Sequence, residues 1–230
     1  MRHRLPRALA ALTAAAAACA GLALAPAGAA TVPSHRVIRN ATPSCGSFCA
    51  NYFVQKYGQG FVLDNYRGRH RIGNRVILFA ASNSDPNQDW TLWPSGTVQQ
   101  LASFGVVSQM LAFNYGADQA FEIEFAPYGV GTGKCAGTAN AASDDQPVTL
   151  QWCGRTSRTI WVADAGAAFD SYEPLISGSD TDFSDPQVLT EPGWPIRRPR
   201  PDLTTYRLQR FADNTVFDDQ MWNNTIGVLP

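Results

Sequence analysis

Two glutamates separated by a single residue are the first candidates for chemistry in this sequence. Glu122 and Glu124 lie in the segment "AFEIEF", where they alternate with apolar residues. In an extended strand this alternation puts both carboxylates on one face, about 7 Å apart along the chain. A pair of carboxylates is the machinery of glycoside hydrolysis. A solvated strand face gives the same pattern, so we predict no catalytic role for the pair.

Other groups for catalysis or metal binding are sparse. Beyond the first 30 residues the histidines are His35 and His70, which leaves little for a catalytic triad. The loop "SGSDTDFSDP" carries Asp180, Asp182 and Asp185 at a spacing suited to calcium. It lacks the glycine and the distant glutamate of a helix-loop-helix calcium site, and it is typical of a turn. We therefore expect no enzyme activity, no metal and no cofactor.

The first 29 residues have the pattern of a secretory signal peptide. Three arginines precede an alanine-rich and leucine-rich run that closes on small residues, so we predict cleavage after Ala29 or Ala30 and a secreted protein. Lipid attachment at Cys19 is the alternative, and it is disfavoured because no leucine stands three residues before that cysteine. We expect residues 30–50 to form an N-terminal segment and residues 51–230 to form one domain.

The charge balance argues against some partners. Removing the three arginines of the leader from the 18 basic side chains leaves 15 against 19 acidic ones, a formal charge of about −4. A chain with a net negative charge is not expected to take nucleic acid or an anionic membrane as its main partner. We expect no membrane contact once the leader has been cleaved.

Four cysteines remain after the leader: Cys45, Cys49, Cys135 and Cys153. An even number is typical of an exported chain with disulfides, and three pairings are possible. We favour Cys45 with Cys49 and Cys135 with Cys153 because the members of each pair are close in sequence. A zinc site is disfavoured since two-residue spacing and a nearby histidine are both missing.

Short runs of β-forming residues, bounded by turn residues, recur along the chain and indicate an all-β fold. The runs are "NYFVQKY", "RVILFA", "WTLW", "AFEIEF", "VTLQW", "TIWVA", "QVLT" and "TYRLQRF".

These runs stack into a weak internal repeat of three units. Each unit has a pair of apolar runs, and the spacing from the first run to the second is similar in all three units: 63–76, 136–148 and 175–188. Such units cannot each bury a face alone, so we predict that they close into a pseudo-threefold barrel. Trp90, Trp161 and Tyr206 would then form its aromatic core. A second register stays open, in which Gln220-Met221-Trp222 supplies the third aromatic residue.

The stretch "SNSDPNQDWTL" raises a separate question. Asn87 and Gln88 stand directly before the strand that starts at Trp90, whereas the second unit has Arg158 and Thr159 in their place. Turn building is one interpretation of such residues. Because the pair does not recur there, we interpret it as a sign of a ligand in the first unit only.

Four features of the first unit occur together in a fixed order. They are Leu63-Asp64, the turn Gly73-Asn74, the apolar run from Val76 to Phe79, and Asn87-Gln88-Asp89-Trp90. This order resembles the ricin B-type β-trefoil lectins. The resemblance implies a β-trefoil fold, and the Cys135 and Cys153 pair sits where that family often has a disulfide.

The resemblance also implies a shallow sugar site in the first unit. Asp64 would accept hydrogen bonds from sugar hydroxyls, Phe79 would stack on the ring, and Asn87 would add a polar contact. Gln88 would support Asp64 from behind while Trp90 packs in the core. Elementary chemistry agrees, because a carboxylate makes strong hydrogen bonds to hydroxyls and an aromatic ring covers the C–H face of a pyranose.

The other units weaken the case for several sites. Gly137 and Ile176 stand at the positions that we match to Asp64, and Gln151 matches Phe79. We therefore expect a non-enzymatic, secreted carbohydrate-binding protein with one site, whose partner is a glycan or polysaccharide.

The alternative is a secreted protein-binding or protease-inhibitor-like β-trefoil that acts through exposed loops. The insertion at 191–201 carries Arg197, Arg198 and Arg200 between prolines. A basic side chain held in this way suits a trypsin-like pocket.

Overall fold

The computed structural model describes residues 51–55, 60–82, 84–154, 156–168, 172–181, 184–192, 202–210 and 212–226. The segments 1–29 and 30–50, with Cys45 and Cys49, lie outside the described residues, and so does 193–201 with its three arginines.

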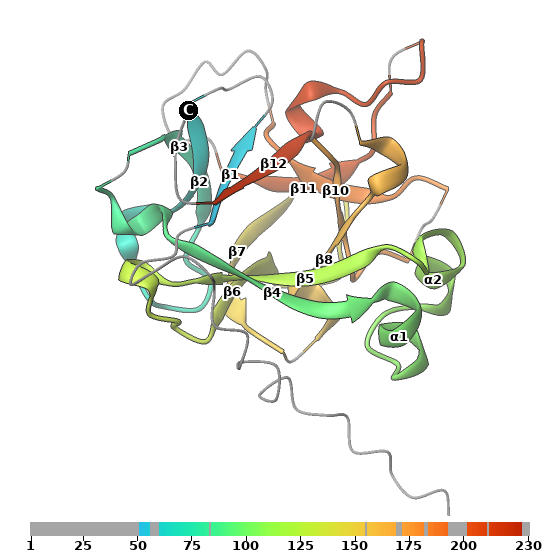
Figure 1. Ribbon diagram of the computed structural model, residues 1–230, viewed down its shortest axis with the longest axis horizontal. Helices are drawn as coiled ribbons and strands as arrows, with labels where there is room; N and C mark the ends of the chain where they lie inside the picture. Colours follow the sequence, from blue (N-terminus) through green and yellow to red (C-terminus); the bar gives the residue numbers. More distant parts are fainter. Residues whose placement is uncertain are drawn as a thin grey trace, which may run out of the picture. The chain divides into compact units, whose positions relative to one another are not determined.

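The described chain is an all-β domain made of three units with four strands each (Figure 1). The first unit holds β1 (Asn51–Gln55), β2 (Phe61–Asn65), β3 (Val76–Ala80) and β4 (Trp90–Thr97). The second holds β5 (Gln119–Phe125), β6 (Lys134–Thr138), β7 (Gln146–Trp152) and β8 (Ile160–Ala163). The third holds β9 (Leu175–Ser177), β10 (Gln187–Thr190), β11 (Thr204–Arg207) and β12 (Trp222–Ile226).

The first and fourth strands of the units form a closed barrel. β1 pairs with β12 and β4, β4 with β5, β5 with β8, and β8 with β9. The ring is completed where Glu173, just before β9, bridges to Trp222 at the start of β12. There Glu173 N donates to Trp222 O (2.8 Å) and Trp222 N donates to Glu173 O (3.0 Å).

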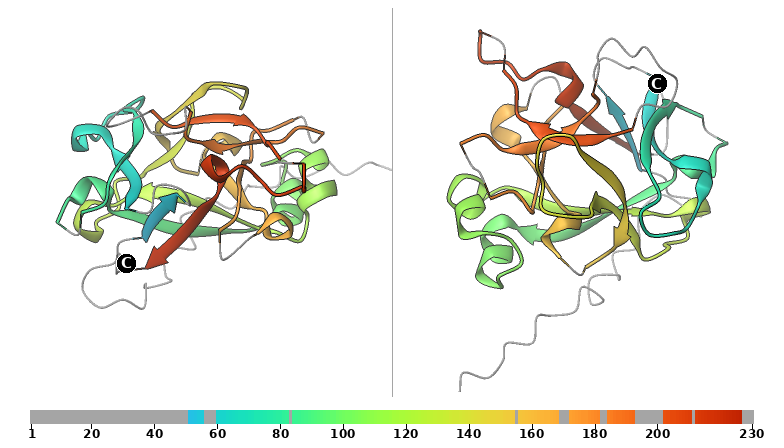
Figure 2. Two further views of the ribbon diagram at one scale, coloured as in Figure 1. Left: turned by 90° about the horizontal axis from the view of Figure 1, so that it is seen from above. Right: turned by 180° about the vertical axis from the view of Figure 1, so that it is seen from behind.

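The second and third strands of each unit form a hairpin, and the three hairpins are tied to one another. They can be followed in the right-hand view of Figure 2. Leu150 N donates to Asn74 O (2.8 Å), Val148 N to Leu203 O (2.9 Å), and Leu203 N to Val76 O (3.1 Å). Each hairpin thus bonds to the other two, which is the pseudo-threefold arrangement of a β-trefoil.

Three buried tryptophans repeat the same contact around the barrel. The indole N–H groups of Trp90, Trp161 and Trp222 donate to the carbonyls of Leu63 (3.1 Å), Ala136 (3.0 Å) and Leu189 (2.8 Å), respectively. All three rings are fully buried in one hydrophobic cluster. Since a buried indole N–H needs an acceptor, this bond fixes each ring against the second strand of its own unit.

The prediction that Tyr206 is the third core aromatic residue is wrong, and the register with Trp222 is right. Tyr206 is only half-buried, on β11 opposite Val188. Consequently β9, which contains Ile176, is the first strand of the third unit and not the second. The long insertion between β10 and β11 lengthens the spacing inside the third hairpin, and this displaced the sequence-based register.

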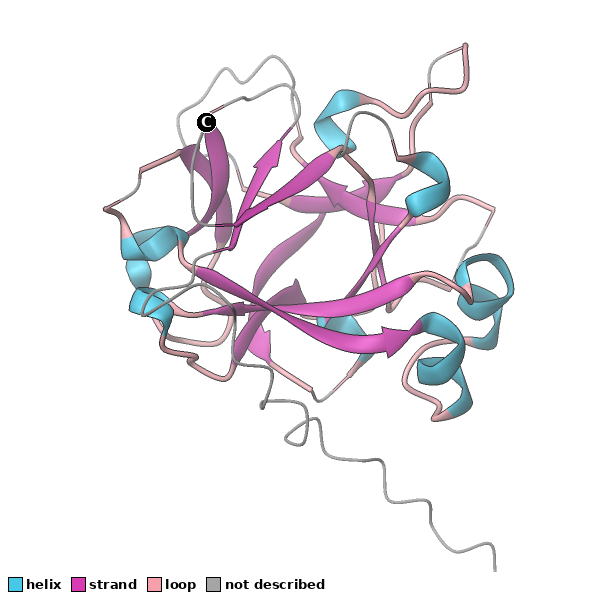
Figure 3. Cartoon of the chain, viewed as in Figure 1, coloured by secondary structure: helices cyan, strands magenta, loops and turns pink. Residues whose placement is uncertain are grey.

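Two short helices, α1 (Val98–Ser103) and α2 (Gln109–Tyr115), connect β4 to β5, and neither was predicted from the sequence, which indicated an all-β fold (Figure 3). Thr97 and Gln100 form a capping box at the start of α1. The helices pack on a second apolar cluster with Val162, Ile176 and Val188. Helices of this length show too few turns for periodicity to reveal them. In the described part of the chain no helix is long and apolar enough to cross a membrane.

A disulfide joins β6 to the residue after β7. The pair is Cys135 and Cys153, 18 residues apart, as predicted. It closes the second hairpin at its open end, where Cys153 N also donates to Gly133 O (3.1 Å).

Candidate functional site

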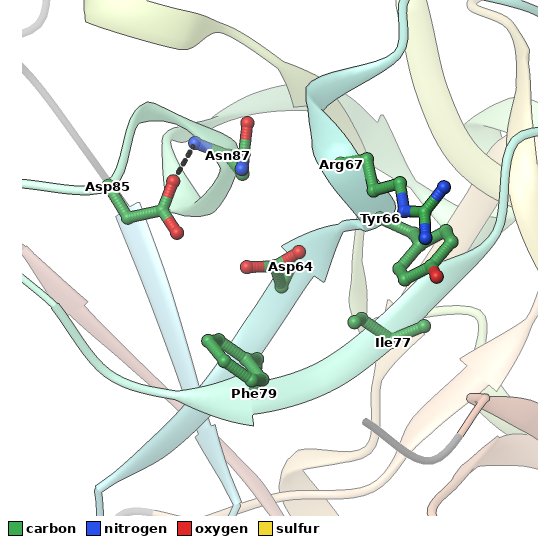
Figure 4. Close-up of a pocket in the computed structure, with 7 residues that line it drawn as sticks. All are labelled: Asp64, Tyr66, Arg67, Ile77, Phe79, Asp85 and Asn87. Atoms are coloured by element: carbon green, nitrogen blue, oxygen red, sulfur yellow. Dashed lines mark hydrogen bonds between the residues drawn. The ribbon is translucent and has the colours of Figure 1, made fainter. Parts of the chain in front are cut away.

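A shallow pocket lies in the first unit, between the end of β2, the strand β3 and the loop before β4 (Figure 4). Its lining residues are Asp64, Tyr66, Arg67, Ile77, Phe79, Asp85 and Asn87. Its volume of about 90 Å³ is small beside the roughly 300–1,000 Å³ of enclosed ligand sites. The pocket can therefore receive one edge or face of a ligand and not enclose it.

Asp64 lies at the centre of this pocket (Figure 4), and a buried side chain that does not line the pocket fixes its carboxylate. Its carboxylate Oδ2 accepts a hydrogen bond from Gln88 Nε2 (3.3 Å), and Gln88 is fully buried. Gln88 Nε2 also donates to Ala80 O (2.8 Å), while Ser82 N donates to Gln88 Oε1 (2.8 Å). Gln88 does not line the pocket, so any effect on a ligand passes through Asp64.

Gln88 has a counterpart in the third unit, which corrects the interpretation of the Asn-Gln pair. Gln220 Nε2 donates to Arg207 O (2.8 Å) and to Thr190 Oγ1 (3.2 Å), and Gln220 Oε1 accepts from Gln209 N (2.7 Å). These bonds repeat those of Gln88. Gln88 is therefore part of the fold, and only Asn87 remains particular to the first unit.

Asn87 is presented by a tight 3-10 turn, Pro86–Gln88. Asp85 caps this turn, because its Oδ1 accepts from Asn87 N (3.0 Å). The Asn87 side chain lies against Gly68, so close that a β-carbon on Gly68 would overlap Asn87 Oδ1. Within the described part of the chain the side-chain amide of Asn87 makes no hydrogen bond, which leaves its Nδ2 donors and its Oδ1 acceptor for a ligand.

Phe79 lies half-buried on β3, opposite Val62, and forms the floor of the pocket with Ile77. The structure thus brings Asp64, Phe79 and Asn87 together around one small hollow.

Four lining residues were missed by the sequence reasoning: Tyr66, Arg67, Ile77 and Asp85. The Asp85-Pro86 pair was a usable signal, because an aspartate before proline is typical of the start of a turn.

The second unit has no equivalent set of side chains. Gly137 occupies the position of Asp64, and a β-carbon there would overlap Arg158 O. Gln151 occupies the position of Phe79 and donates to Thr149 Oγ1 (2.7 Å).

The third unit differs from the sequence-based match. Thr190, and not Ile176, stands at the position of Asp64, while Tyr206 takes that of Phe79 and Asp219 that of Asn87. Thr190 Oγ1 donates to Val188 O (3.0 Å). This unit therefore keeps the aromatic side chain and lacks the carboxylate at the strand end.

A buried acid, Glu191, and a half-buried acid, Asp219, lie beside each other in that third unit, where Glu191 N donates to Asp219 O (3.1 Å). Burial and, to a lesser degree, the charge of Asp219 together raise the pKa of Glu191 to about 7. Burial likewise raises the pKa of Asp219 to about 6. Glu191 is 1% exposed, and its Oε2 has no hydrogen-bond partner among the described residues.

Glu122 and Glu124 share a strand as expected, but the alternative of a solvated face is wrong because both are buried. Glu124 accepts from Gly133 N (2.5 Å) and Trp93 Nε1 (2.5 Å). Glu122 Oε1 accepts from Gly154 N (2.6 Å) and Thr159 Oγ1 (2.6 Å). The carboxylates thus hold the loops at Gly133 and Gly154 in place, and Glu124 also ties β5 to Trp93 of β4.

The acidic loop of the third unit is also engaged. Asp180 Oδ2 accepts from Gln187 N (3.0 Å), and Asp185 lies 3.5 Å from the Arg207 guanidinium. Asp182 lies outside the described residues. Among those that are described, no group of three or more His, Cys, Asp or Glu is arranged to hold a metal ion.

Comparison with known proteins gives structural matches alone. No family model matches the sequence, and no curated protein does. The chain is similar to ThreeFoil, a designed threefold-symmetric protein, at 18% identity and a TM-score of 0.52, over 76% of this chain and 97% of that one.

Two larger proteins contain a similar part. An exo-β-1,3-galactanase from Clostridium thermocellum matches at 13% identity and a TM-score of 0.51, over 77% of this chain and 30% of its own. A mosquitocidal holotoxin matches at 12% identity and a TM-score of 0.51, over 76% of this chain and 17% of the toxin chain. This chain thus spans less than a third of either protein. At such identities the likeness shows the fold, which is a β-trefoil.

Proposed function

We propose that this protein is a secreted carbohydrate-binding protein whose site is the pocket of the first unit. The observation that carries the proposal is the meeting of a carboxylate, an aromatic ring and an uncommitted amide, from Asp64, Phe79 and Asn87, in one shallow hollow. A sugar edge offers hydroxyl groups to the carboxylate and amide, and its C–H face offers a surface to the ring.

Because the pocket is small and shallow, we expect it to bind each single sugar weakly. A shallow site of this kind has affinities in the millimolar to sub-millimolar range, about −4 to −6 kcal/mol. Useful retention then comes from a polymer that presents many copies of the same sugar. A polysaccharide is therefore a better ligand than a free monosaccharide.

Binding without catalysis is part of the proposal. The paired acids Glu122 and Glu124 are buried and bound to loop N–H groups, so they do not face a substrate. Export is proposed on the leader pattern, and the Cys135–Cys153 disulfide agrees with an oxidising compartment.

The test is glycan binding by Asp64→Asn. The asparagine keeps the volume and one acceptor for Gln88, so the free energy of unfolding should change by less than about 1 kcal/mol. Loss of the charge should weaken glycan binding at least about tenfold. Isothermal titration with galactan and xylan oligosaccharides measures the affinity, and thermal unfolding measures the stability.

Thr190→Ala is the matched control, because Thr190 holds the same position in the third unit. It should leave glycan affinity unchanged. A wild-type protein that binds nothing in a broad glycan screen would overturn the proposed function.

A further inference from the structure

The loop between β2 and β3 carries an unusual density of positive charge. We call residues 66–75 the basic loop; it holds Arg67, Arg69, His70, Arg71 and Arg75. All five side chains are exposed. No acidic residue occurs in the sequence between Asp64 and Asp85, although acids outnumber bases in the whole chain.

The basic loop is ordered by hydrogen bonds. The buried Asn74 side chain donates to Asn65 Oδ1 (2.5 Å) and to Tyr66 O (2.9 Å), and Asn65 Nδ2 donates to Arg69 O (3.2 Å). Gly73 N donates to Leu150 O (2.8 Å) in the neighbouring hairpin. The arginines are thus displayed from a fixed backbone, which reduces the entropy lost when a ligand binds.

Most of this charge is not used by the fold. Arg75 pairs with Asp202 (2.6 Å), whereas Arg67, Arg69 and Arg71 form no ion pair within the described part of the chain. The matching loop of the second unit, 139–145, carries Asp144 and Asp145 and no basic residue. The fold therefore does not require positive charge in this loop.

Arg67 connects the basic loop to the pocket. It lines the pocket, and its guanidinium lies over the Tyr66 ring at 5.0 Å, with that of Arg75 at 4.6 Å from the same ring. Its backbone is left-handed (φ 58°, ψ 21°), which costs a residue other than glycine roughly 1 kcal/mol or more. In the view of Figure 4, Arg67 and Asp85 lie on opposite sides of Asp64.

We propose that the ligand of this pocket is an acidic glycan, a sugar that carries a carboxylate or a sulfate group. This inference rests on the proposed function of the same pocket. The neutral part of the ring lies against Asp64, Phe79 and Asn87. The acid group lies on the Arg67 side, away from Asp85, where a guanidinium can bind its two oxygens together.

The test compares three trisaccharides of equal length, a uronate, a sulfated galactose and a neutral galactose, by isothermal titration with the full chain. One of the two acidic probes should bind at least about tenfold more tightly than the neutral one. The preferred acidic probe identifies which acid group is recognised. The preference should shrink with added salt, because exposed charges are screened.

Arg67→Asn is the decisive variant, since asparagine tolerates the left-handed backbone and removes the charge. The ratio of acidic to neutral affinity should fall towards one, and Arg67→Lys should recover part of it. Arg210→Asn is the matched control, because Arg210 is an exposed arginine of the third unit. It should leave the ratio unchanged.

Three results overturn the inference. If the neutral probe binds as tightly as both acidic ones, the acidic ligand is wrong and the sugar site stands. If a single-stranded DNA of equal charge binds as well as the acidic sugars and survives Asp64→Asn, the basic loop is a general polyanion surface. If no probe binds and a broad glycan screen is also negative, the proposed function falls together with this inference.

Discussion

At the scale of single residues, the pocket depends on backbone geometry as much as on polar side chains. Gly68 has φ +60° and no β-carbon, and only for that reason can the Asn87 side chain lie against it. Arg67, directly before it, adopts a left-handed backbone without being glycine. Because Arg67 and Gly68 both have a left-handed backbone, the chain turns so that Arg67 lines the pocket and Asn87 can lie against Gly68 on the pocket wall.

Gly68→Ala should therefore damage the site and not just the turn. The left-handed backbone costs alanine about 1 kcal/mol of stability, and the new methyl group displaces Asn87. We expect glycan affinity to fall at least about fivefold in titration experiments, because a polar contact to the sugar is lost.

Gly73→Ala separates these two effects. Gly73 lies in the same loop with φ +77°, and a β-carbon there would meet nothing within 4 Å. It should lose a similar amount of stability and keep full affinity. Equal binding by both variants would contradict the role given to Asn87.

At the scale of elements, the repeated and the unrepeated residues have different roles. Trp90 and Gln88 recur in the third unit as Trp222 and Gln220, with the same hydrogen bonds. A residue that recurs with the same partners serves the barrel that all units share. Asp64 and Asn87 are replaced in the other units, so the site depends on the residues that break the repeat.

Unfolding experiments on the third unit should distinguish its core aromatic from its surface aromatic. Trp222→Ala removes a fully buried ring and should cost roughly 3–5 kcal/mol, whereas Tyr206→Ala should cost about 1 kcal/mol. Urea denaturation measures both free energies.

Trp222→Phe is the milder variant if the alanine variant does not fold. It keeps a buried ring but leaves the carbonyl of Leu189 without its donor, at a cost of about 1–3 kcal/mol. A larger effect at Tyr206 than at Trp222 would restore the original register.

At the scale of the whole molecule, buried acids make folding depend on pH. The pKa of Glu191 rises from an ordinary 4.5 to about 7, and that of Asp219 from 3.8 to about 6, both mainly by burial. The folded protein then binds more protons than the unfolded chain between these values. This contribution to stability is complete below about pH 4 and is lost as the pH rises through about 7.

The free energy of unfolding should accordingly be higher near pH 5 than near pH 8. Glu191→Gln removes the most strongly shifted acid, so the difference between the two pH values should shrink. Urea denaturation at both pH values provides the measurement.

Asp213→Asn is the control for this effect. Asp213 is exposed, and hydrogen bonds from Thr215 lower its pKa, so it titrates below the tested range. Its pH dependence should match that of the wild type. An unchanged pH dependence in Glu191→Gln would contradict the assignment.

The local pattern of the sequence determined a great deal by itself. Alternating apolar runs between turn residues predicted an all-β chain with three units, because side chains of a strand point to opposite faces. The first unit was the most predictable, since its four motif features occur in a fixed order and no long insertion separates them. Cys135 and Cys153 were paired correctly because the hairpin that they close is short.

Only the tertiary structure decided which residues are equivalent and which side chains meet. Tyr206 and Trp222 were both candidates for the third core aromatic residue, and the hydrogen bond from the Trp222 indole to the carbonyl of Leu189 selects Trp222. The sequence pattern of Glu122 and Glu124 is that of a solvated strand face, whereas in the folded protein both side chains are buried and accept hydrogen bonds from loop N–H groups. Arg67 reaches the pocket through a left-handed turn, and its neighbours there come from three separate segments. Periodicity reports the face of a strand, but distances between segments far apart in the sequence arise only when the barrel closes.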